Sequence, residues 1–193
     1  MPGDAAPRPP FLFVRHGQTE YNVRGILAGS SDVALTATGV AEAEAAAELL
    51  AGQPLRTICS SPLKRARETA RLIAGPHRLA VTIIEDLRER DWGEWEGQAF
   101  PADLGHPHPP GGEEMGGYLA RVAGALERFF ALSGDGPALI VAHGGIFHAL
   151  CRLLGVANAT AGVIGNAQPV RFQPTAGESG WTVAPVPAGP AGG

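Results

Sequence analysis

The chain has 193 residues, of which 45% are hydrophobic and 18% charged, a composition typical of a globular protein that can bury a core. The net charge of −4 argues against a nucleic-acid-binding surface of clustered lysines and arginines. Two cysteines, Cys59 and Cys151, lie in apolar segments and indicate buried thiols, not a disulfide framework. The first residues lack a basic region, and no window approaches the roughly 18 apolar residues that span a bilayer. We therefore expect a soluble, cytoplasmic protein, monomeric or homodimeric, that binds neither nucleic acid nor membranes.

Short apolar runs alternate with segments of helical periodicity. The apolar runs predict strands at residues 11–14, 55–59, 79–84 and 138–142, and edge strands at 168–172 and 181–183. Helical periodicity predicts helices at residues 37–51, 62–75, 113–132 and 145–154. This alternation is typical of a three-layer α/β/α domain with a mostly parallel sheet. We expect one domain over residues 1–184 and a disordered tail over 185–193, where PVPAGPAGG offers no core-forming run.

Local signals refine two of these segments. Ser61 is a favourable N-cap and Pro62 suits the first position of the second helix, which we expect to end at Gly75. After the third strand, a long irregular stretch reaches Gly112 and carries acidic and aromatic residues. Loops of this length are often functional.

Two histidines directly follow predicted buried strands. Arg15, His16 and Gly17 come after FLFV, and His143 and Gly144 come after ALIVA. In open α/β sheets, ligands bind beyond the carboxyl ends of the strands, and glycines there permit close approach of a ligand. If the two strands are neighbours, the two imidazoles face one another.

A third cationic residue, Arg65, lies about one turn inside the helix that follows the second strand. Helix N-termini attract anions, and the guanidinium fork matches the oxygens of a phosphate. Arg15, Arg65 and the two histidines would form a pocket for one tetrahedral phosphate. Taken singly, HGG could be only a tight turn and Arg65 only a solvated residue; their joint occurrence at strand ends favours a phosphate site.

These residues are sufficient for phosphoryl transfer without a metal or cofactor. Arginines can stabilise the equatorial oxygens of the transition state, and a neutral imidazole can act as the nucleophile. A carboxylic acid can protonate the leaving oxygen and then activate water. The segment LRERDWGEWEG offers four candidates for this acid, namely Glu89, Asp91, Glu94 and Glu96.

The segments VRHGQTEYN, SSPLKRARETA, LRERDWGEWEG and LIVAHGG resemble, in order, the motifs of the histidine phosphatase family, also called the phosphoglycerate mutase-like family. The resemblance spans residues 11–154 and implies that family's fold. It implies His16 as the phosphorylated nucleophile and Glu89 as the proton donor. It further implies a phosphate pocket and its rim, formed by Arg15, Arg65, His143, Asn22, Gly144 and Gly29.

Two departures from the family pattern bear on the reaction. Gln18 stands where many members have glutamate, and about fifteen residues separate Gly97 from Glu113, where mutases usually carry a longer insertion. A mutase must keep water off its phosphohistidine, so a short loop favours hydrolysis of a small phosphorylated substrate. The WGEWEG segment also resembles the α-ribazole phosphatase and broad-specificity branch of the family. A phosphoglycerate mutase and a non-catalytic phosphate- or phosphoprotein-binding module are the alternatives.

The remaining histidines are not expected to hold a metal. His106 and His108 in GHPHPP have no cysteine or carboxylate at ligand spacing, so we expect a surface loop. His77 is expected in a loop, and His148 on a helix near the pocket.

Overall fold

The computed structural model describes residues 8–99, 109–156, 164–175 and 180–187. Six strands form one mixed sheet in the order β3-β2-β4-β1-β5-β6. Their bounds are Phe11–Arg15 for β1, Thr57–Ser60 for β2, Val81–Ile83 for β3, Ala138–Ala142 for β4, Pro169–Pro174 for β5 and Trp181–Pro185 for β6. The first four strands run parallel to one another, and β5 and β6 are antiparallel additions beside β1. The predicted α/β class with a mostly parallel sheet is confirmed.

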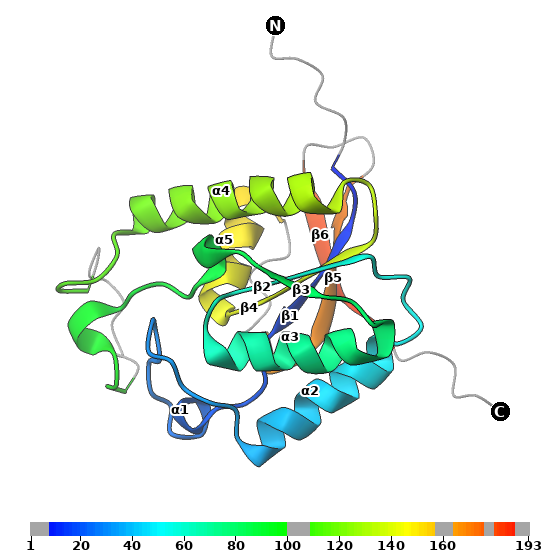
Figure 1. Ribbon diagram of the computed structural model, residues 1–193. Helices are drawn as coiled ribbons and strands as arrows, with labels where there is room; N and C mark the ends of the chain where they lie inside the picture. The colour runs from blue at the N-terminus through cyan, green and yellow to red at the C-terminus, as the bar shows by residue number, and fades with distance from the viewer. Residues whose placement is uncertain (1–7, 100–108, 157–163, 176–179, 188–193) are drawn as a thin grey trace, which may run out of the picture.

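Helices cover both faces of the sheet (Figure 1). They are α1 (Glu20–Val23), α2 (Ala37–Leu50), α3 (Lys64–His77), α4 (Met115–Ser133) and α5 (Gly144–Leu153), with short 3-10 turns at Glu85–Leu87 and Gly93–Trp95. Along β1, Phe11 and Phe13 face the core under α4 and α5, whereas Leu12 and Val14 face the core under α2 and α3. Because successive strand residues point to opposite faces, both faces are apolar, as a strand buried between two helical layers requires.

Several element boundaries differ from the predictions. Helix α3 begins at Lys64 after the N-cap Leu63, not at Pro62; Ser61 Oγ accepts from the amide of Leu63 but also contacts a histidine described below. It runs past Gly75 to His77 and ends where Arg78 adopts a left-handed conformation (φ 54°), so His77 is helical and not in a loop. Strand β5 lies between β1 and β6 and is therefore not an edge strand.

The single-turn helix α1 was not predicted, because four residues are too few to show a period. Its signal is local: Thr19 and Asn22 form a reciprocal capping box. The prediction of a disordered segment from residue 185 onward is wrong at its start. Pro185 pairs with Val170 in the sheet and Val186 is buried against the α2–α3 core; residues 188–193 lie outside the described part.

Both cysteines are buried, as predicted, and burial raises the pKa of Cys59 and of Cys151 to about 11. Within the described ranges, no helix combines the length and apolarity needed to cross a bilayer.

Candidate active site

The two strand-end histidines meet at one point of the sheet edge. Strands β1 and β4 are neighbours, and the pairing of Arg15 with Ala142 brings the next residues, His16 and His143, side by side. Their ring centroids lie 5.2 Å apart, and the side chains are 4% and 0% exposed. The predicted opposition of the two imidazoles is confirmed.

The protonation state of His16 follows from its neighbours. Nδ1 lies 2.8 Å from the carbonyl oxygen of Gly17, which can only accept, so Nδ1 carries the proton. Nε2 therefore keeps its lone pair and accepts from Nε of Arg65 at 3.2 Å. Burial, together with the charge of Arg65, lowers the pKa of His16 well below its ordinary value. The imidazole is neutral at neutral pH, with a nucleophilic nitrogen directed toward the arginine.

Arg65 is held by backbone carbonyls. It is 1% exposed, and Nη1 and Nη2 donate to the carbonyl oxygens of Ser31 and Gly29 at 2.7 and 2.8 Å. In the described part of the chain, no carboxylate lies within ion-pairing distance of its guanidinium. Burial lowers the pKa of Arg65 to about 10, which still leaves it charged at neutral pH. The pocket thus contains a fixed, unpaired positive charge.

Arg15 and His143 each bury a side-chain nitrogen that has no hydrogen-bond partner in the described structure. Nη1 of Arg15 donates to the carbonyl of Ile164 at 2.9 Å, while its Nε is buried with no partner among the described residues. Ser61 Oγ accepts from the amide of Leu63 and lies 2.7 Å from Nε2 of His143. Donation of the Ser61 hydroxyl proton to Nε2 satisfies both groups and leaves the proton of His143 on Nδ1, which also lacks a partner in the described structure. Burial, then the charge of Arg65, lowers the pKa of His143 well below its ordinary value.

Glu89 is fixed beside the second histidine. Its Oε2 accepts from the amide of Gly145 at 2.9 Å, and its Oε1 accepts from the amide of Arg90 at 2.8 Å and from the Tyr118 hydroxyl at 3.4 Å. Burial and the charge of Glu89 raise the pKa of Tyr118, so this hydroxyl remains protonated. Glu89 lines the same cavity as Arg15, His16 and Arg65.

The other three candidate acids are engaged elsewhere. Asp91 accepts from the amide of Gly93, and Glu94 is exposed. Glu96 accepts from the amides and hydroxyls of Ser30 and Ser31, and from the amide of Trp92. Although burial opposes it, hydrogen bonding by the serines lowers the pKa of Glu96 below its ordinary value. Of the four, Glu89 is the carboxylate that faces the cavity.

Glu96 has a role that the sequence did not reveal. The carbonyls of Gly29 and Ser31 that hold Arg65 belong to the loop that Glu96 holds. The loop passes so close to Glu96 that a Cβ on Gly29, which also has a positive φ of 49°, would lie 2.0 Å from the Glu96 carboxylate. Gly29 is therefore required by backbone geometry, and Glu96 positions Arg65 indirectly.

The remaining predicted residues also reach this region. Asn22 and Gly144 line the cavity. The Asn22 side-chain oxygen accepts from Thr19 and from Nδ2 of Asn166, so its amide nitrogen is the group left for a ligand. Gly17, expected to admit a ligand, instead admits a helix: a Cβ there would lie 2.3 Å from the carbonyl oxygen of Gly39 in α2.

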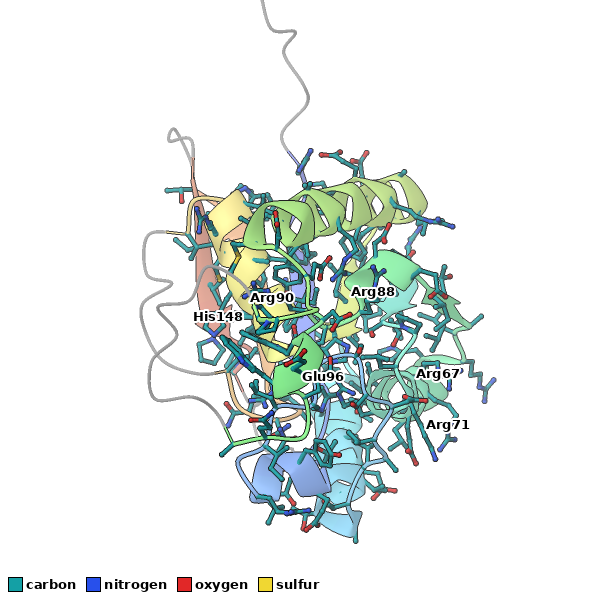
Figure 2. All side chains as sticks on the ribbon, turned by 90° about the vertical axis from the view of Figure 1, so that its left-hand side faces the viewer. Arg67, Arg71, Arg88, Arg90, Glu96 and His148 are labelled. Carbon is teal, nitrogen blue, oxygen red and sulfur yellow. The ribbon has the colours of Figure 1, made fainter. Side chains whose placement is uncertain are left out.

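The cavity has a volume of about 500 Å³ and extends well past the histidines. Its outer wall includes Arg90, which follows Glu89, and His148 on α5, as expected from the sequence; Figure 2 shows both side chains from this side. Within the described ranges no group of His, Cys, Asp or Glu side chains could hold a metal ion. His106 and His108 lie outside those ranges.

Residues 11–182 match the histidine phosphatase superfamily (branch 1). The chain belongs to this superfamily. The order of its motifs predicted this membership, and the predictions of the family and of a phosphatase are both confirmed.

Relatives of this histidine phosphatase carry several names. The adenosylcobalamin/alpha-ribazole phosphatase of Escherichia coli K12 is 31% identical over 158 residues, which cover 74% of this chain and 78% of the relative. An agropine synthesis reductase of Rhizobium rhizogenes is 34% identical over 183 residues, but these span 90% of this chain and only 41% of the relative. Among solved structures, a mycobacterial glucosyl-3-phosphoglycerate phosphatase in complex with VO3 is 29% identical, with a TM-score of 0.77 and coverage of 93% and 97% of the two chains.

Proposed function

We propose that this histidine phosphatase hydrolyses small phosphomonoesters through a phosphohistidine formed on Nε2 of His16. The observation that carries the proposal is the neutral imidazole of His16 lying beside His143 and next to Arg15, both of which bury an N–H donor without a partner among the described residues. Buried polar groups are otherwise almost always paired, so these donors indicate a ligand rich in acceptor oxygens. A phosphoryl group satisfies that requirement.

In the first step, Nε2 of His16 attacks phosphorus and the bond to the ester oxygen breaks. Arg15, Arg65 and Nδ1–H of His143 stabilise the equatorial oxygens, and Asn22 and the amide of Gly144 are placed to add donors. Glu89 in its acid form protonates the leaving oxygen.

In the second step, a water molecule attacks the phosphohistidine. Glu89, now a carboxylate, accepts a proton from this water as the new P–O bond forms. The N–P bond breaks, the lone pair returns to Nε2 of His16, and inorganic phosphate leaves. The hydrogen bond from Nδ1 of His16 to the Gly17 carbonyl keeps the ring oriented through both steps.

The class of substrate is supported by the relatives. Two of them are named adenosylcobalamin/alpha-ribazole phosphatase and glucosyl-3-phosphoglycerate phosphatase, and both names indicate small phosphorylated substrates. A phosphoglycerate mutase would use the same pocket, and the two activities separate in one assay: 3-phosphoglycerate yields inorganic phosphate with a phosphatase and an isomer with a mutase. A non-catalytic binding module has no requirement for a nucleophile with an acid beside it.

The test is a panel of phosphomonoesters, including 3-phosphoglycerate, assayed for phosphate release with and without a chelator. We expect activity in both conditions, a loss of at least about a thousandfold in His16→Ala, and an acid-labile phosphoenzyme in the wild type alone. His77→Ala, at the far end of α3, is the matched control and should retain activity. Loss of activity on chelation, or an active His16→Ala variant, would contradict the mechanism.

A further inference from the structure

The cavity is larger than a phosphate group needs. Its volume of about 500 Å³ is in the range that accommodates a whole small organic ligand. Beyond the phosphate end, defined as Arg15, His16, Arg65 and the buried His143 that neighbours His16, the cavity is also lined by the apolar side chains of Ile26, Leu27, Met115, Leu119 and Ala149. These walls suit the carbon skeleton of a leaving group.

One buried cation in the outer wall has no anionic partner among the described residues. Arg90 is 5% exposed, and its Nε and Nη2 both donate to the carbonyl of Glu113, at 3.0 and 2.9 Å. The guanidinium also lies over the Trp92 ring, 4.7 Å from the centroid. Its Nη1 makes no hydrogen bond, and no carboxylate ion-pairs with it, to any described residue. The nearby Glu113 carboxylate is paired with Arg121 instead, at 2.6 Å.

This arrangement is costly unless a ligand completes it. Burying a charge without a counter-charge is unfavourable. The nearby Glu113 carboxylate does not supply that counter-charge to Arg90, because it is paired with Arg121. Three contacts fix the guanidinium plane, so the side chain loses no further freedom when a ligand arrives. Arg90 is thus a preorganised donor that lines the cavity, and its Nη1 has no partner among the described residues.

A further arginine and a histidine also line the cavity. His148 and Arg152 are four residues apart on α5, so they share a face of that helix, and both line the cavity. Figure 2 shows the Arg90 and His148 side chains on the same side of the molecule. Glu89 is the one carboxylate among the described residues that line the cavity, and its oxygens are already hydrogen-bonded. The electrostatic balance of this wall favours an anion.

We propose that the leaving-group end of the cavity, defined as Arg90, Trp92, His148 and Arg152, binds a second anionic group of the substrate, such as a carboxylate. The preferred substrates are then phosphomonoesters of small organic acids with an apolar or ring-shaped body. This proposal rests on the proposed function, because the phosphate end must hold the phosphoryl group while the leaving-group end holds the second anion.

The test compares two aryl phosphates of the same shape, 4-carboxyphenyl phosphate and its neutral analogue 4-carbamoylphenyl phosphate. The wild type should prefer the carboxylate by about 10- to 100-fold in kcat/KM, the value of a charge-assisted hydrogen bond. Arg90→Gln should bring the ratio of the two kcat/KM values close to one. Arg88→Gln is the matched control: Arg88 lies two residues earlier, is partly exposed, does not line the cavity and is bonded to Asp86, so its ratio should equal that of the wild type.

A second variant covers the case that Arg90→Gln fails to fold, since Arg90 also holds the Glu113 carbonyl. Arg152 is exposed, and Arg152→Gln should lower the ratio by about threefold without affecting folding, as checked by thermal unfolding. Equal hydrolysis of both compounds by the wild type would overturn this proposal alone, as would an equal loss on both in the variants. If neither compound is hydrolysed, the proposed function fails with it.

Discussion

The two ends of the cavity are built differently. At the phosphate end, each side chain leaves a strand end or the first turn of a helix, and three of the four are hydrogen-bonded to backbone carbonyls: Arg65 to Gly29 and Ser31, Arg15 to Ile164 and His16 to Gly17. At the leaving-group end, Arg90 alone is fixed in this way, while His148 and Arg152 are exposed on α5. Backbone anchoring suits a group common to every substrate, whereas exposed side chains suit a group that varies.

After the change at His16, the proposed nucleophile, we expect the largest effect from replacing Glu89, the proposed acid. Glu89→Gln keeps acceptor capacity but cannot give a proton to the leaving oxygen. We expect kcat/KM to fall by about 10² to 10⁴ for alkyl phosphates, which need that proton, and by less than about tenfold for 4-nitrophenyl phosphate, which does not. Measuring kcat/KM isolates the first phosphoryl transfer from the later attack of water.

The matched control for Glu89→Gln is Glu94→Gln in the same segment, because Glu94 is exposed and should be silent with both substrates. Equal slowing of alkyl and aryl phosphates by Glu89→Gln would move the proton donor to another carboxylate and would separate Glu89 from the chemistry.

The sequence predicted that His16 and His143 meet at one edge of the sheet, because this geometry follows from local rules. Apolar runs mark buried strands, parallel strands bring their carboxyl ends to one edge, and His16 and His143 follow those runs directly. The leaving-group end was not predicted. Arg90 and Trp92 lie in an irregular segment without a period, and their contact with Glu113 joins positions that are far apart along the chain.

Contacts between positions far apart in the sequence also explain why the roles of Ser61 and Glu96 were not predicted. Ser61 looks like a helix N-cap in sequence, yet its hydroxyl lies against His143 across the sheet. Glu96 looks like one of four equivalent acids, and only its contacts with Ser30 and Ser31 distinguish it. Pairings across tens of residues are set by tertiary packing, which spacing along the chain does not encode.

Glu96→Gln tests whether this indirect support acts on the phosphate end alone. An amide nitrogen would face the amide and hydroxyl donors of Ser30 and Ser31, so the loop that holds Arg65 should loosen. We expect kcat/KM to fall about tenfold and the inhibition constant for inorganic phosphate to rise about tenfold, with the carboxylate-to-carboxamide ratio unchanged.

Glu94→Gln again provides the control for Glu96→Gln, since both changes remove one negative charge from the same turn. A changed carboxylate-to-carboxamide ratio in Glu96→Gln would show that the two ends of the cavity are not independent. A fall in melting temperature with unchanged phosphate inhibition would reduce Glu96 to a purely structural residue.

The smallest expected effect is on stability, and it too separates the ends. His16 and His143 are buried as neutral rings, and burial lowers the pKa of each. As the pH falls below about 6.5, these histidines therefore bind protons in the unfolded chain but not in the folded chain. The stability contributed by each neutral ring is therefore present above that pH and is lost below it. The free energy of unfolding should fall by about 1 kcal/mol per imidazole between pH 7 and 5.5.

Denaturant unfolding of His143→Asn should show a shallower pH dependence than the wild type, whereas His148→Asn, which alters an exposed ring at the other end, should match the wild type. An unchanged slope in His143→Asn would mean that the ring is protonated or solvated in the folded state, and the phosphate end would then lack the dry, neutral histidine pair on which its chemistry depends.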